Sequence, residues 1–387
     1  MTSVKKLTAI AVTTVFFVAC RKDIKGPDPV EEASAETTSA KVNEERGYSH
    51  SGYVYTLSNQ STDNKVMVYR RDSDGELSFI KSYSSGGNGT GSGLGSQGAV
   101  TLAGNDNILL AVNAGSNTIS SFKVSHDELE LISTVGSKGI KPISIAQYDK
   151  LVYVLNAGGN GNISGFRIAG DGQLIAIPNS TRPLSSNASD PAQISFVNEG
   201  TALVITEKGT NKIITYTVNH FGVPAAFHSL ASANATPFGF AVGEQGKIYV
   251  SEAAGGAAGA SSVSSYRVGY NGAISLTNGP VLAGQTAACW VVLTGNGKYV
   301  YATNTGSNSV SSFTANLPGN INTFHAVAAN SGTTPIDAAL SDQSKFLYVL
   351  NANGHSISVF RVSDNGELSN IQTVTGLPAG DIGLAAE

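Results

Sequence analysis

Apolar runs of strand length recur along most of the chain, and each run ends in a small polar or acidic residue. A turn rich in Gly, Asn and Ser follows each run, and then comes a strand in which apolar and polar residues alternate, such as TISSFKV (118–124). Continuous apolar runs are typical of strands buried on both faces, whereas alternation is typical of half-exposed strands. The seven runs are GYVYTLS (52–58), ILLAVN (108–113), LVYVLN (151–156), ALVITE (202–207), KIYVSE (247–252), YVYATN (299–304) and FLYVLN (346–351).

The spacing of these runs predicts a repeated unit of four short strands. The end of the run advances by 55, 43, 51, 45, 52 and 47 residues from one unit to the next. Turns such as SDGE (73–76) and DNGE (364–367) supply the glycine that a tight hairpin needs. No segment of helix length shows a 3.6-residue period. We therefore predict an all-β fold over residues 52–387, a seven-bladed β-propeller with four antiparallel strands in each blade.

The two ends of this region predict how the ring closes. The repeat begins at a second strand, so the first blade lacks its innermost strand. The C-terminal segment GLPAGDIGLAAE (376–387) is similar to the first-strand segment TTPIDAALS (333–341). We expect Ile382 to Ala386 to complete the first blade, which removes a free sheet edge.

The N-terminus predicts a targeting signal over residues 1–20. Lys5 and Lys6 precede an apolar run from Leu7 to Val18, too short to span a bilayer. The end of this run, Phe17-Val18-Ala19-Cys20, resembles a bacterial lipoprotein signal, in which the cysteine receives lipid. Residues 21–51 are polar and small, and predict a flexible tether. We expect a lipid-anchored protein of the bacterial cell envelope, periplasmic or at the cell surface; the alternative is an ordinary cleaved signal and a secreted protein.

Composition excludes several classes of protein. Hydrophobic residues make up 41% of the chain and the formal net charge is only -4, which excludes a disordered chain. The weak charge gives no electrostatic reason to expect nucleic acid as a partner, and we expect a monomer. The second of the two cysteines, Cys289, lies in an apolar stretch, and we expect it to be buried without a disulfide. No second long apolar segment predicts a membrane span, so we expect contact with the membrane through the lipid anchor only.

In a propeller the first strands line a central channel, and loops from several blades surround its mouth, where ligands bind. We expect a small molecule, a glycan or a partner protein there. Two rings of residues follow from the repeat. Aligned first strands place near the mouth, each to within one residue, Asp381, Gln97, Ser144, Gln193, Phe238, Trp290 and Asp337. The second strands end in Ser58, Asn113, Asn156, Glu207, Glu252, Asn304 and Asn351.

Acidic residues at two of these strand ends are candidates for catalysis. Glu207 and Glu252 stand where five other blades have neutral residues, and Asp337 is expected nearby. Such a carboxylate can act as a general base on water; the alternative is that these side chains accept hydrogen bonds from turn amides. The candidate ligand-binding residues are Trp290, Gln193, Gln97, Asp381 and Lys208. For Trp290 two roles are open, stacking on a flat ligand or plugging the hollow centre.

The glycine-rich segment 84–98 contains a GxGxxG spacing, but a channel strand rather than a helix follows it, so we expect a mobile loop over the channel mouth instead of a phosphate site. The loop 253–262 is expected at the same mouth. None of the six histidines falls on a channel strand or pairs at metal-ligand spacing. We therefore expect neither a metal nor another cofactor.

The repeats YVLNAGGNGNISGFRI (153–168), YATNTGSNSVSSF (301–313) and YVLNANGHSISVFRV (348–362) resemble those of YVTN-type propellers and of the lactonase family, which includes propeller-type 6-phosphogluconolactonases. The resemblance covers residues 52–387. It implies an active site that combines a histidine and arginines on channel strands with a glutamate at a second-strand end. Glu207 matches that glutamate, but Ala192-Gln193 stand in place of the family's arginine-histidine pair.

The resemblance therefore implies a lactone or ester hydrolase with a divergent site, in which Glu207 or Glu252 activates water and Asp337 assists. The alternative function is a non-catalytic surface propeller that binds a glycan, a peptide or a partner protein at the channel mouth.

Overall fold

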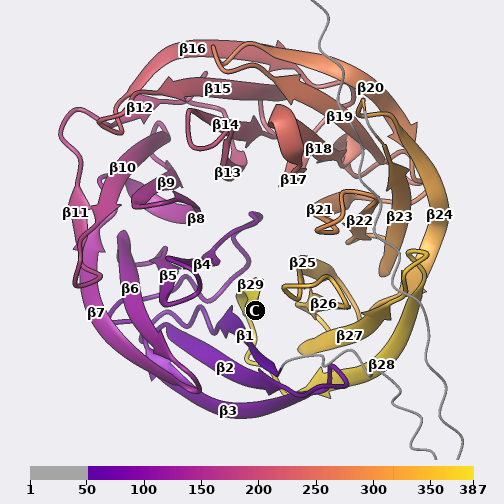
Figure 1. Ribbon diagram of the computed structural model, residues 1–387, viewed down its shortest axis with the longest axis horizontal. Coiled ribbons are helices and arrows are strands. Elements are labelled where there is room, and N and C mark those ends of the chain that lie inside the picture. The colour runs from indigo at the N-terminus through magenta and orange to yellow at the C-terminus, as the bar shows by residue number, and fades with distance from the viewer. Residues whose placement is uncertain (1–50, 317) are drawn as a thin grey trace, which may run out of the picture. The chain divides into compact units, whose positions relative to one another are not determined.

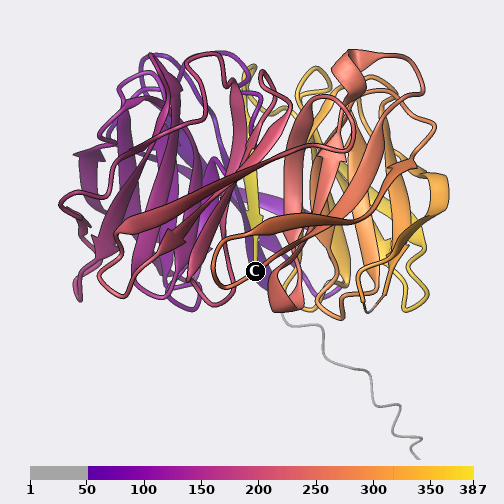
Figure 2. The same ribbon diagram turned by 90° about the horizontal axis from the view of Figure 1, so that it is seen from above.

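The computed structural model describes residues 51–316 and 318–387. The predicted signal over residues 1–20, its Cys20 and the predicted tether up to residue 50 lie outside the described residues. Seven antiparallel sheets follow one another around a ring, as Figure 1 shows from above a face and Figure 2 from the side. The predicted seven-bladed β-propeller is confirmed.

Six blades are sheets of four strands and blade 3 has five, because its outer strand is in two pieces; the strands are given below from the central axis outward. Blade 1 consists of β29 (Ile382–Ala386), β1 (Gly52–Leu57), β2 (Lys65–Arg71) and β3 (Leu77–Ser84). Blade 2 consists of β4 (Val100–Ala103), β5 (Ile108–Asn113), β6 (Thr118–Ser125) and β7 (Glu128–Gly136). Blade 3 consists of β8 (Ile140–Tyr148), β9 (Leu151–Gly158), β10 (Asn162–Ile168), β11 (Leu174–Ala176) and β12 (Arg182–Pro183). Its outer strand is interrupted, because β11 and β12 both pair with β10.

The remaining blades are regular. Blade 4 consists of β13 (Pro191–Val197), β14 (Ala202–Glu207), β15 (Lys212–Val218) and β16 (Pro224–Ala231). Blade 5 consists of β17 (Pro237–Val242), β18 (Lys247–Glu252), β19 (Ser262–Val268) and β20 (Ile274–Leu282). Blade 6 consists of β21 (Ala288–Leu293), β22 (Tyr299–Asn304), β23 (Ser309–Ala315) and β24 (Ile321–Asn330). Blade 7 consists of β25 (Pro335–Leu340), β26 (Phe346–Asn351), β27 (Ser356–Val362) and β28 (Leu368–Thr375).

The described residues contain two single 3-10 turns, η1 (Glu244–Gly246) and η2 (Ala254–Gly256), and no α-helix. Within this part of the chain, no helix is long and apolar enough to cross a membrane. Burial follows the predicted pattern, since every residue of the second strands β14, β18 and β26 is buried, whereas the outer strand β16 is mostly exposed.

Glycines in the outer turns join neighbouring blades. Gly366 of blade 7 has φ +81°, and a β-carbon there would lie 2.4 Å from the ring of Tyr299 in blade 6. Gly75 of blade 1 has φ +96°, and a β-carbon would lie 2.2 Å from Phe346 in blade 7. The glycine therefore both turns the hairpin and leaves room for the first side chain of the preceding blade's second strand.

The ring closes as predicted, because β29 pairs antiparallel with β1 inside blade 1. The Glu387 N–H donates to Tyr53 O (3.0 Å), and Tyr55 Oη donates to Glu387 Oε1 (2.8 Å). Ile382 and Leu384 of β29 are buried. Main-chain pairing and apolar burial therefore both hold the seam.

Ending the chain at Gly376 removes β29, and we expect the melting temperature to fall by about 10 °C or more, since two buried aliphatic side chains and one ladder are lost together. Thermal unfolding followed by circular dichroism measures this. A synthetic peptide of residues 377–387, added in excess, should restore part of the loss. An unchanged melting temperature after truncation would show that the seam is not needed.

Candidate functional site

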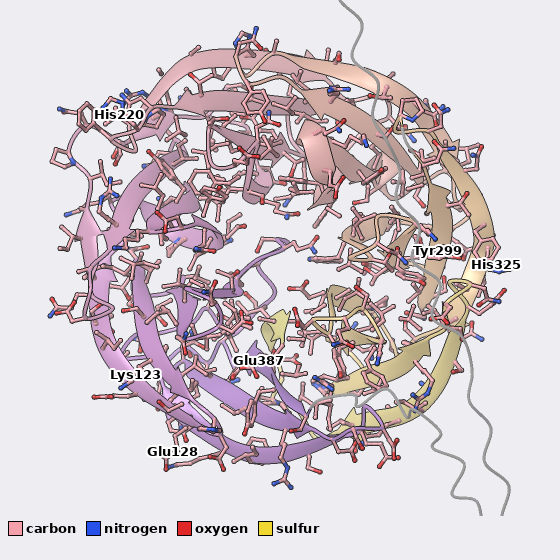
Figure 3. All side chains as sticks on the ribbon, viewed as in Figure 1. Lys123, Glu128, His220, Tyr299, His325 and Glu387 are labelled. Carbon is pink, nitrogen blue, oxygen red and sulfur yellow. The ribbon has the colours of Figure 1, made fainter. Side chains whose placement is uncertain are left out.

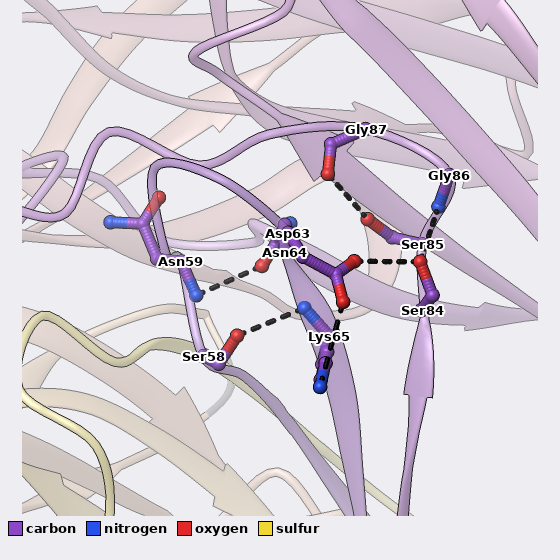
Figure 4. Close-up of polar contacts among 9 residues, drawn as sticks. All are labelled: Ser58, Asn59, Asp63, Asn64, Lys65, Ser84, Ser85, Gly86 and Gly87. Carbon is purple, nitrogen blue, oxygen red and sulfur yellow. Dashed lines mark hydrogen bonds and ion pairs between the residues drawn. The ribbon is translucent and has the colours of Figure 1, made fainter.

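The residues at the ends of the second strands are buried and bonded to the strand that follows. Asn113 Nδ2 donates to Ser120 Oγ at 2.8 Å, and the asparagines of blades 6 and 7 make the same bond to Ser311 and Ser358, at 2.9 and 3.0 Å. In blade 1, Ser58 Oγ accepts the Lys65 N–H at 2.9 Å (Figure 4). Most partners are hydroxyls of the third strand rather than the turn amides named in our alternative interpretation. These contacts are those of a structural role.

Glu207 takes the same position in blade 4 and is fully buried. Its Oε1 accepts the Ser185 N–H at 2.8 Å, and its Oε2 accepts the hydroxyls of Ser185 and Thr210. Both carboxylate oxygens are thus bonded within the wall of the propeller.

Glu252 in blade 5 is also fully buried and accepts four hydroxyl donors. Oε1 accepts Ser232 Oγ (3.0 Å) and Tyr266 Oη (2.8 Å); Oε2 accepts Ser262 Oγ (2.6 Å) and Ser264 Oγ (2.7 Å). In the asparagine blades the equivalent serines accept from the amide. Glutamate therefore replaces asparagine by reversing the direction of these hydrogen bonds, and it has no bond left for water.

The segment between β3 and β4 fills the predicted channel mouth. Figure 1 shows the chain ahead of β4 reaching into the middle of the ring. Trp290 Nε1 donates to Ser96 O (2.8 Å), and Lys208 Nζ donates to Gly95 O (2.8 Å). We call residues 92–98 the plug. We expected a mobile loop over the mouth; instead the plug lies inside it, because backbone carbonyls of the loop find donors on blades 4 and 6.

Gln97 extends the plug across the ring to blade 6. Its Nε2 donates to Val291 O (3.0 Å), and its Oε1 accepts the Val291 N–H (3.1 Å), as a strand neighbour would. Gly239 makes room for it, since a β-carbon there would lie 2.3 Å from Gln97 Oε1. Gln193 forms the same pair with Phe240, at 3.0 and 2.6 Å. Both glutamine side chains are therefore engaged with main chain of other blades.

Trp290 and Lys208 belong to the same packed centre. Trp290 is buried and its ring lies 5.0 Å from that of Phe238, so the plugging role is the one its contacts fit. Lys208 lies over Phe238, with Nζ 4.7 Å from the ring centroid, and forms an ion pair with Asp190 at 3.4 Å. Burial lowers the pKa of the Lys208 ammonium, and the Asp190 carboxylate opposes that shift.

Strand register agrees with six of the seven aligned first-strand positions to within the one residue allowed, and corrects Gln97. Ser144, Gln193, Trp290 and Asp337 each pair with the residue that precedes the named end residue of their second strand, as aligned. In blade 1 that place is held by Ile382, one residue after Asp381. In blade 5 the register places Gly239 there rather than Phe238, and in blade 2 Ala99 rather than Gln97. β-bulges and the inserted plug shift these positions, and local pattern does not reveal either.

Below the plug, the channel contains a cavity of about 380 Å³ that reaches the opposite face, where Asp106 and Asp342 are exposed. Asp337 of β25 lines it, and is 1% exposed. Its Oδ1 accepts the Ala338 N–H (2.8 Å), whereas Oδ2 has no hydrogen-bond partner among the described residues. Burial raises the pKa of Asp337 well above its usual range, opposed in part by the amides of Ala338 and Leu384.

Asp381, immediately before β29, is a second buried carboxyl at the seam. Neither of its oxygens has a hydrogen-bond partner within the described part of the chain. Burial raises the pKa of Asp381 to about 7. Asp337 and Asp381 are thus the predicted site residues that lack the internal bonds found for Glu207 and Glu252.

The histidines and the cysteine of the described residues lie outside any cluster of metal-ligand side chains. Within them no group of three or more His, Cys, Asp or Glu side chains is placed to hold a metal ion. Figure 3 places His220 and His325 at the outer edge of the ring. Cys289 is buried without a disulfide, as we expected, and burial raises the pKa of its thiol to about 12.

The residues that shape this centre most, Gly239, Asp106 and Asp342, are not apparent from the sequence pattern, and neither is the lower opening of the cavity. Gly239 is next to Phe238, the residue that the repeat aligns with the Gln, Trp and Asp of other blades, and a shift of one residue in that alignment would have found it. The two aspartates lie in turns between first and second strands, and only the fold shows that these turns meet at one opening.

Comparison with known proteins gives one family and several similar structures. The family described as Lactonase, 7-bladed beta-propeller, matches residues 48–183 and 261–381. The chain is 19% identical to the periplasmic gluconolactonase of Pseudomonas aeruginosa, with a TM-score of 0.68, covering 86% of this chain and 99% of that one. A candidate 6-phosphogluconolactonase of Bacteroides fragilis gives 16% identity, a TM-score of 0.67 and coverage of 86% and 97%.

A protein from Lactobacillus plantarum is similar to the same extent, with 16% identity, a TM-score of 0.70 and coverage of 86% and 98%. At these identities the structural likeness shows the fold alone. None of the curated proteins compared with the chain matches it. The stretch 184–260, which the family does not match, contains Glu207 and Glu252.

Because the Gln97 side chain passes directly over Gly239 to reach blade 6, a larger residue at position 239 should clash with it. Substitution Gly239→Ala places a methyl group against Gln97 Oε1 and 2.7 Å from Cys289 O, and should lower stability by roughly 1–3 kcal/mol. Urea unfolding measures this. Gly93→Ala, in the plug itself, is the matched control, since nothing lies within 4 Å of its added carbon. Equal free energies of unfolding for the two variants would contradict this close approach of Gln97 to Gly239.

The seam predicts a pH dependence of stability. The folded chain binds the Asp381 proton more tightly than the unfolded chain does, so the free energy of unfolding should fall as pH rises from about 4 through 7. Asp381→Asn removes this titration. The free energy of unfolding of the variant should therefore exceed that of wild type by an amount that grows with pH, to roughly 2–4 kcal/mol by pH 8. Urea midpoints at pH 5, 6.5 and 8 measure it. A difference in free energy of unfolding between the two proteins that does not change with pH would rule out the raised pKa of Asp381.

Proposed function

Because the chain belongs to the lactonase family of seven-bladed β-propellers, we propose that it hydrolyses a small uncharged lactone or ester in the lower part of its central channel, with Asp337 as the acid–base group. The observation that carries this proposal is that Asp337, a buried carboxyl whose Oδ2 has no hydrogen-bond partner among the described residues, lines a cavity. Buried polar groups are nearly always bonded, so an unbonded one at a cavity indicates a missing ligand or water.

In the proposed reaction a single carboxyl group first accepts a proton from water and later donates it to the leaving oxygen. Water attacks the carbonyl carbon while Asp337 Oδ2 takes its proton. The bond from that carbon to the ring or ester oxygen then breaks, and Asp337 returns the proton to the departing oxygen, giving a hydroxy acid or an acid and an alcohol. A raised pKa makes the ionised Asp337 carboxylate a stronger base, which suits the first step, and the protonated carboxyl then serves as the acid of the second.

The charge of the cavity supports an uncharged substrate. The described residues that line it include no Lys or Arg, and Asp106 and Asp342 stand at its open end. A phosphorylated sugar lactone would meet two carboxylates and no cation there. The cavity volume of about 380 Å³ is that of a small-molecule site.

Glu207 and Glu252 receive a structural role in this proposal. Glu252 accepts four hydroxyl donors of the blade wall, and Glu207 accepts three hydroxyl or amide donors, so both oxygens of each carboxylate are bonded. Asp337, unlike them, also lies in a stretch that the family matches.

We also propose that the protein is exported and anchored by lipid at Cys20. The basic start, short apolar run and Ala19-Cys20 ending of residues 1–20 support this. One structure of similar fold is itself described as a periplasmic gluconolactonase.

A second candidate function is a non-catalytic binding propeller. It is favoured by the plug, which fills the mouth where ligand loops were expected and engages Gln97, Trp290 and Lys208 in internal bonds.

Turnover of neutral lactones and aryl esters distinguishes the two functions. Glucono-δ-lactone and p-nitrophenyl acetate are suitable substrates, followed by acid release and absorbance. Asp337→Asn should lower kcat by roughly 10²–10⁴-fold without loss of melting temperature, because the amide keeps the shape but cannot carry the proton. Glu207→Gln is the control, and should lose stability while the remaining folded protein keeps its kcat. Activity that depends on Glu207 but survives Asp337→Asn would overturn this assignment, and no activity at all would favour the binding function.

A further inference from the structure

A separate cavity lies between blades 5 and 6, on the face that carries the turns between first and second strands. Its volume is about 390 Å³, and Val242, Leu293, Lys247, Tyr249 and the turn at 294–297 line it. It shares no lining residue with the central channel cavity. Any ligand of this cavity is therefore independent of the proposed lactone site.

Lys247, the first residue of β18, is 5% exposed. Its ammonium has no hydrogen-bond or ion-pair partner among the residues that the structure describes. Its stem is buried, and the residue lines the cavity. An ammonium that faces a cavity and is not paired within the described protein can bind an anion there.

The other blades show what this position normally holds. Counting back from the equivalent ends of the second strands, the residues in this place are Tyr53, Ile108, Leu151, Ala202, Tyr299 and Phe346. Leu151, Tyr299 and Phe346 each pack against the outer-turn glycine of the next blade. The stem of Lys247 does the same, with Cδ 3.6 Å from where a β-carbon of Gly319 would lie. In blade 5 the stem of Lys247 thus keeps the apolar contact with the outer-turn glycine, and its ammonium adds a positive charge that this packing does not require.

Tyr249, two residues further on the same face of β18, differs from its equivalents in blades 3 and 6, whereas Tyr348 in blade 7 likewise has no hydrogen-bond partner among the described residues. Tyr153 and Tyr301 donate to the outer-turn glycine carbonyl of the next blade, at 2.6 and 2.9 Å. In blade 5 the corresponding carbonyl, Gly319 O, accepts Ser265 Oγ at 2.5 Å. Tyr249 Oη has no hydrogen-bond partner among the described residues, and burial raises its pKa, so it stays a neutral donor. The cavity is therefore lined by two side chains whose donor groups have no hydrogen-bond partner among the described residues.

We propose that this cavity binds a small organic monocarboxylate with an apolar body. The carboxylate accepts hydrogen bonds from Lys247 Nζ and Tyr249 Oη, and the body lies against Val242 and Leu293. Glu244, exposed at the rim, also lines the cavity. Its charge opposes a dianion such as phosphate, which is why a single negative charge is assigned.

Titration calorimetry of the full chain with benzoate and, separately, with inorganic phosphate tests this site. Benzoate should bind one to one and raise the melting temperature. Lys247→Met keeps the stem and removes the charge, and should weaken benzoate binding at least about tenfold. It should leave the fold of the ligand-free protein intact, because the methionine stem keeps the contact with Gly319. Tyr249→Phe should weaken binding several-fold.

Lys298→Met is the matched control, because Lys298 is exposed on a neighbouring turn of the same face, and its benzoate affinity should equal that of wild type. Benzoate binding that survives Lys247→Met, binding of phosphate but not benzoate, or no saturable benzoate binding up to about 20 mM would each overturn the proposal. Since the cavity lies outside the channel, Lys247→Met should leave any lactone turnover unchanged, so failure of one proposal does not decide the other.

Discussion

Closure of the ring is the constraint on which the other features of this propeller depend. Tyr55 and Glu387 are 332 residues apart in sequence, yet a hydrogen bond joins them inside one blade. Until β29 pairs with β1, blade 1 lacks its innermost strand and the channel cavity lacks part of its wall. The loop-closure entropy of that pairing is lost once for the whole domain, and seven blade interfaces are stabilised in return. A buried, unbonded Asp381 at the start of the closing strand weakens the seam wherever that carboxyl is ionised.

The fold could be predicted from the sequence because its signals are local and repeated. Each apolar run, each turn glycine and the final IGLAA segment carry their own pattern, and seven copies make the period unmistakable. The candidate site could be predicted only in part. Asp337 and Gln193 were aligned correctly from the repeat, but Gln97 was not, since the plug inserts before β4 and bonds to a blade on the far side of the ring. Bonds of that kind depend on the closed ring, and no local pattern records them.

Buried polar groups fall into two classes that carry different meanings. Glu252 is saturated by four hydroxyls, and its blade exchanges an amide donor for a carboxylate acceptor without leaving an atom unbonded. Asp337 is also buried, but its Oδ2 has no hydrogen-bond partner among the described residues, and the residue lines a cavity. Lys247 lines another cavity with a buried stem and an ammonium that is not paired within the described protein. The pattern of acidic residues along the sequence does not make this distinction, which appears only once the blades have packed.

The position of the last strand has a practical consequence. Ala386 lines the channel cavity, and Glu387 lies beside its opening, near the central axis (Figures 1 and 3). Anything fused after Glu387 would emerge at the entrance that a channel substrate must use, and would pull on the pairing that seals the ring. Affinity tags, fluorescent proteins and immobilisation chemistry are therefore better placed on the opposite face, for example in the exposed loop around Gly255 and Gly256, where added atoms meet nothing within 4 Å.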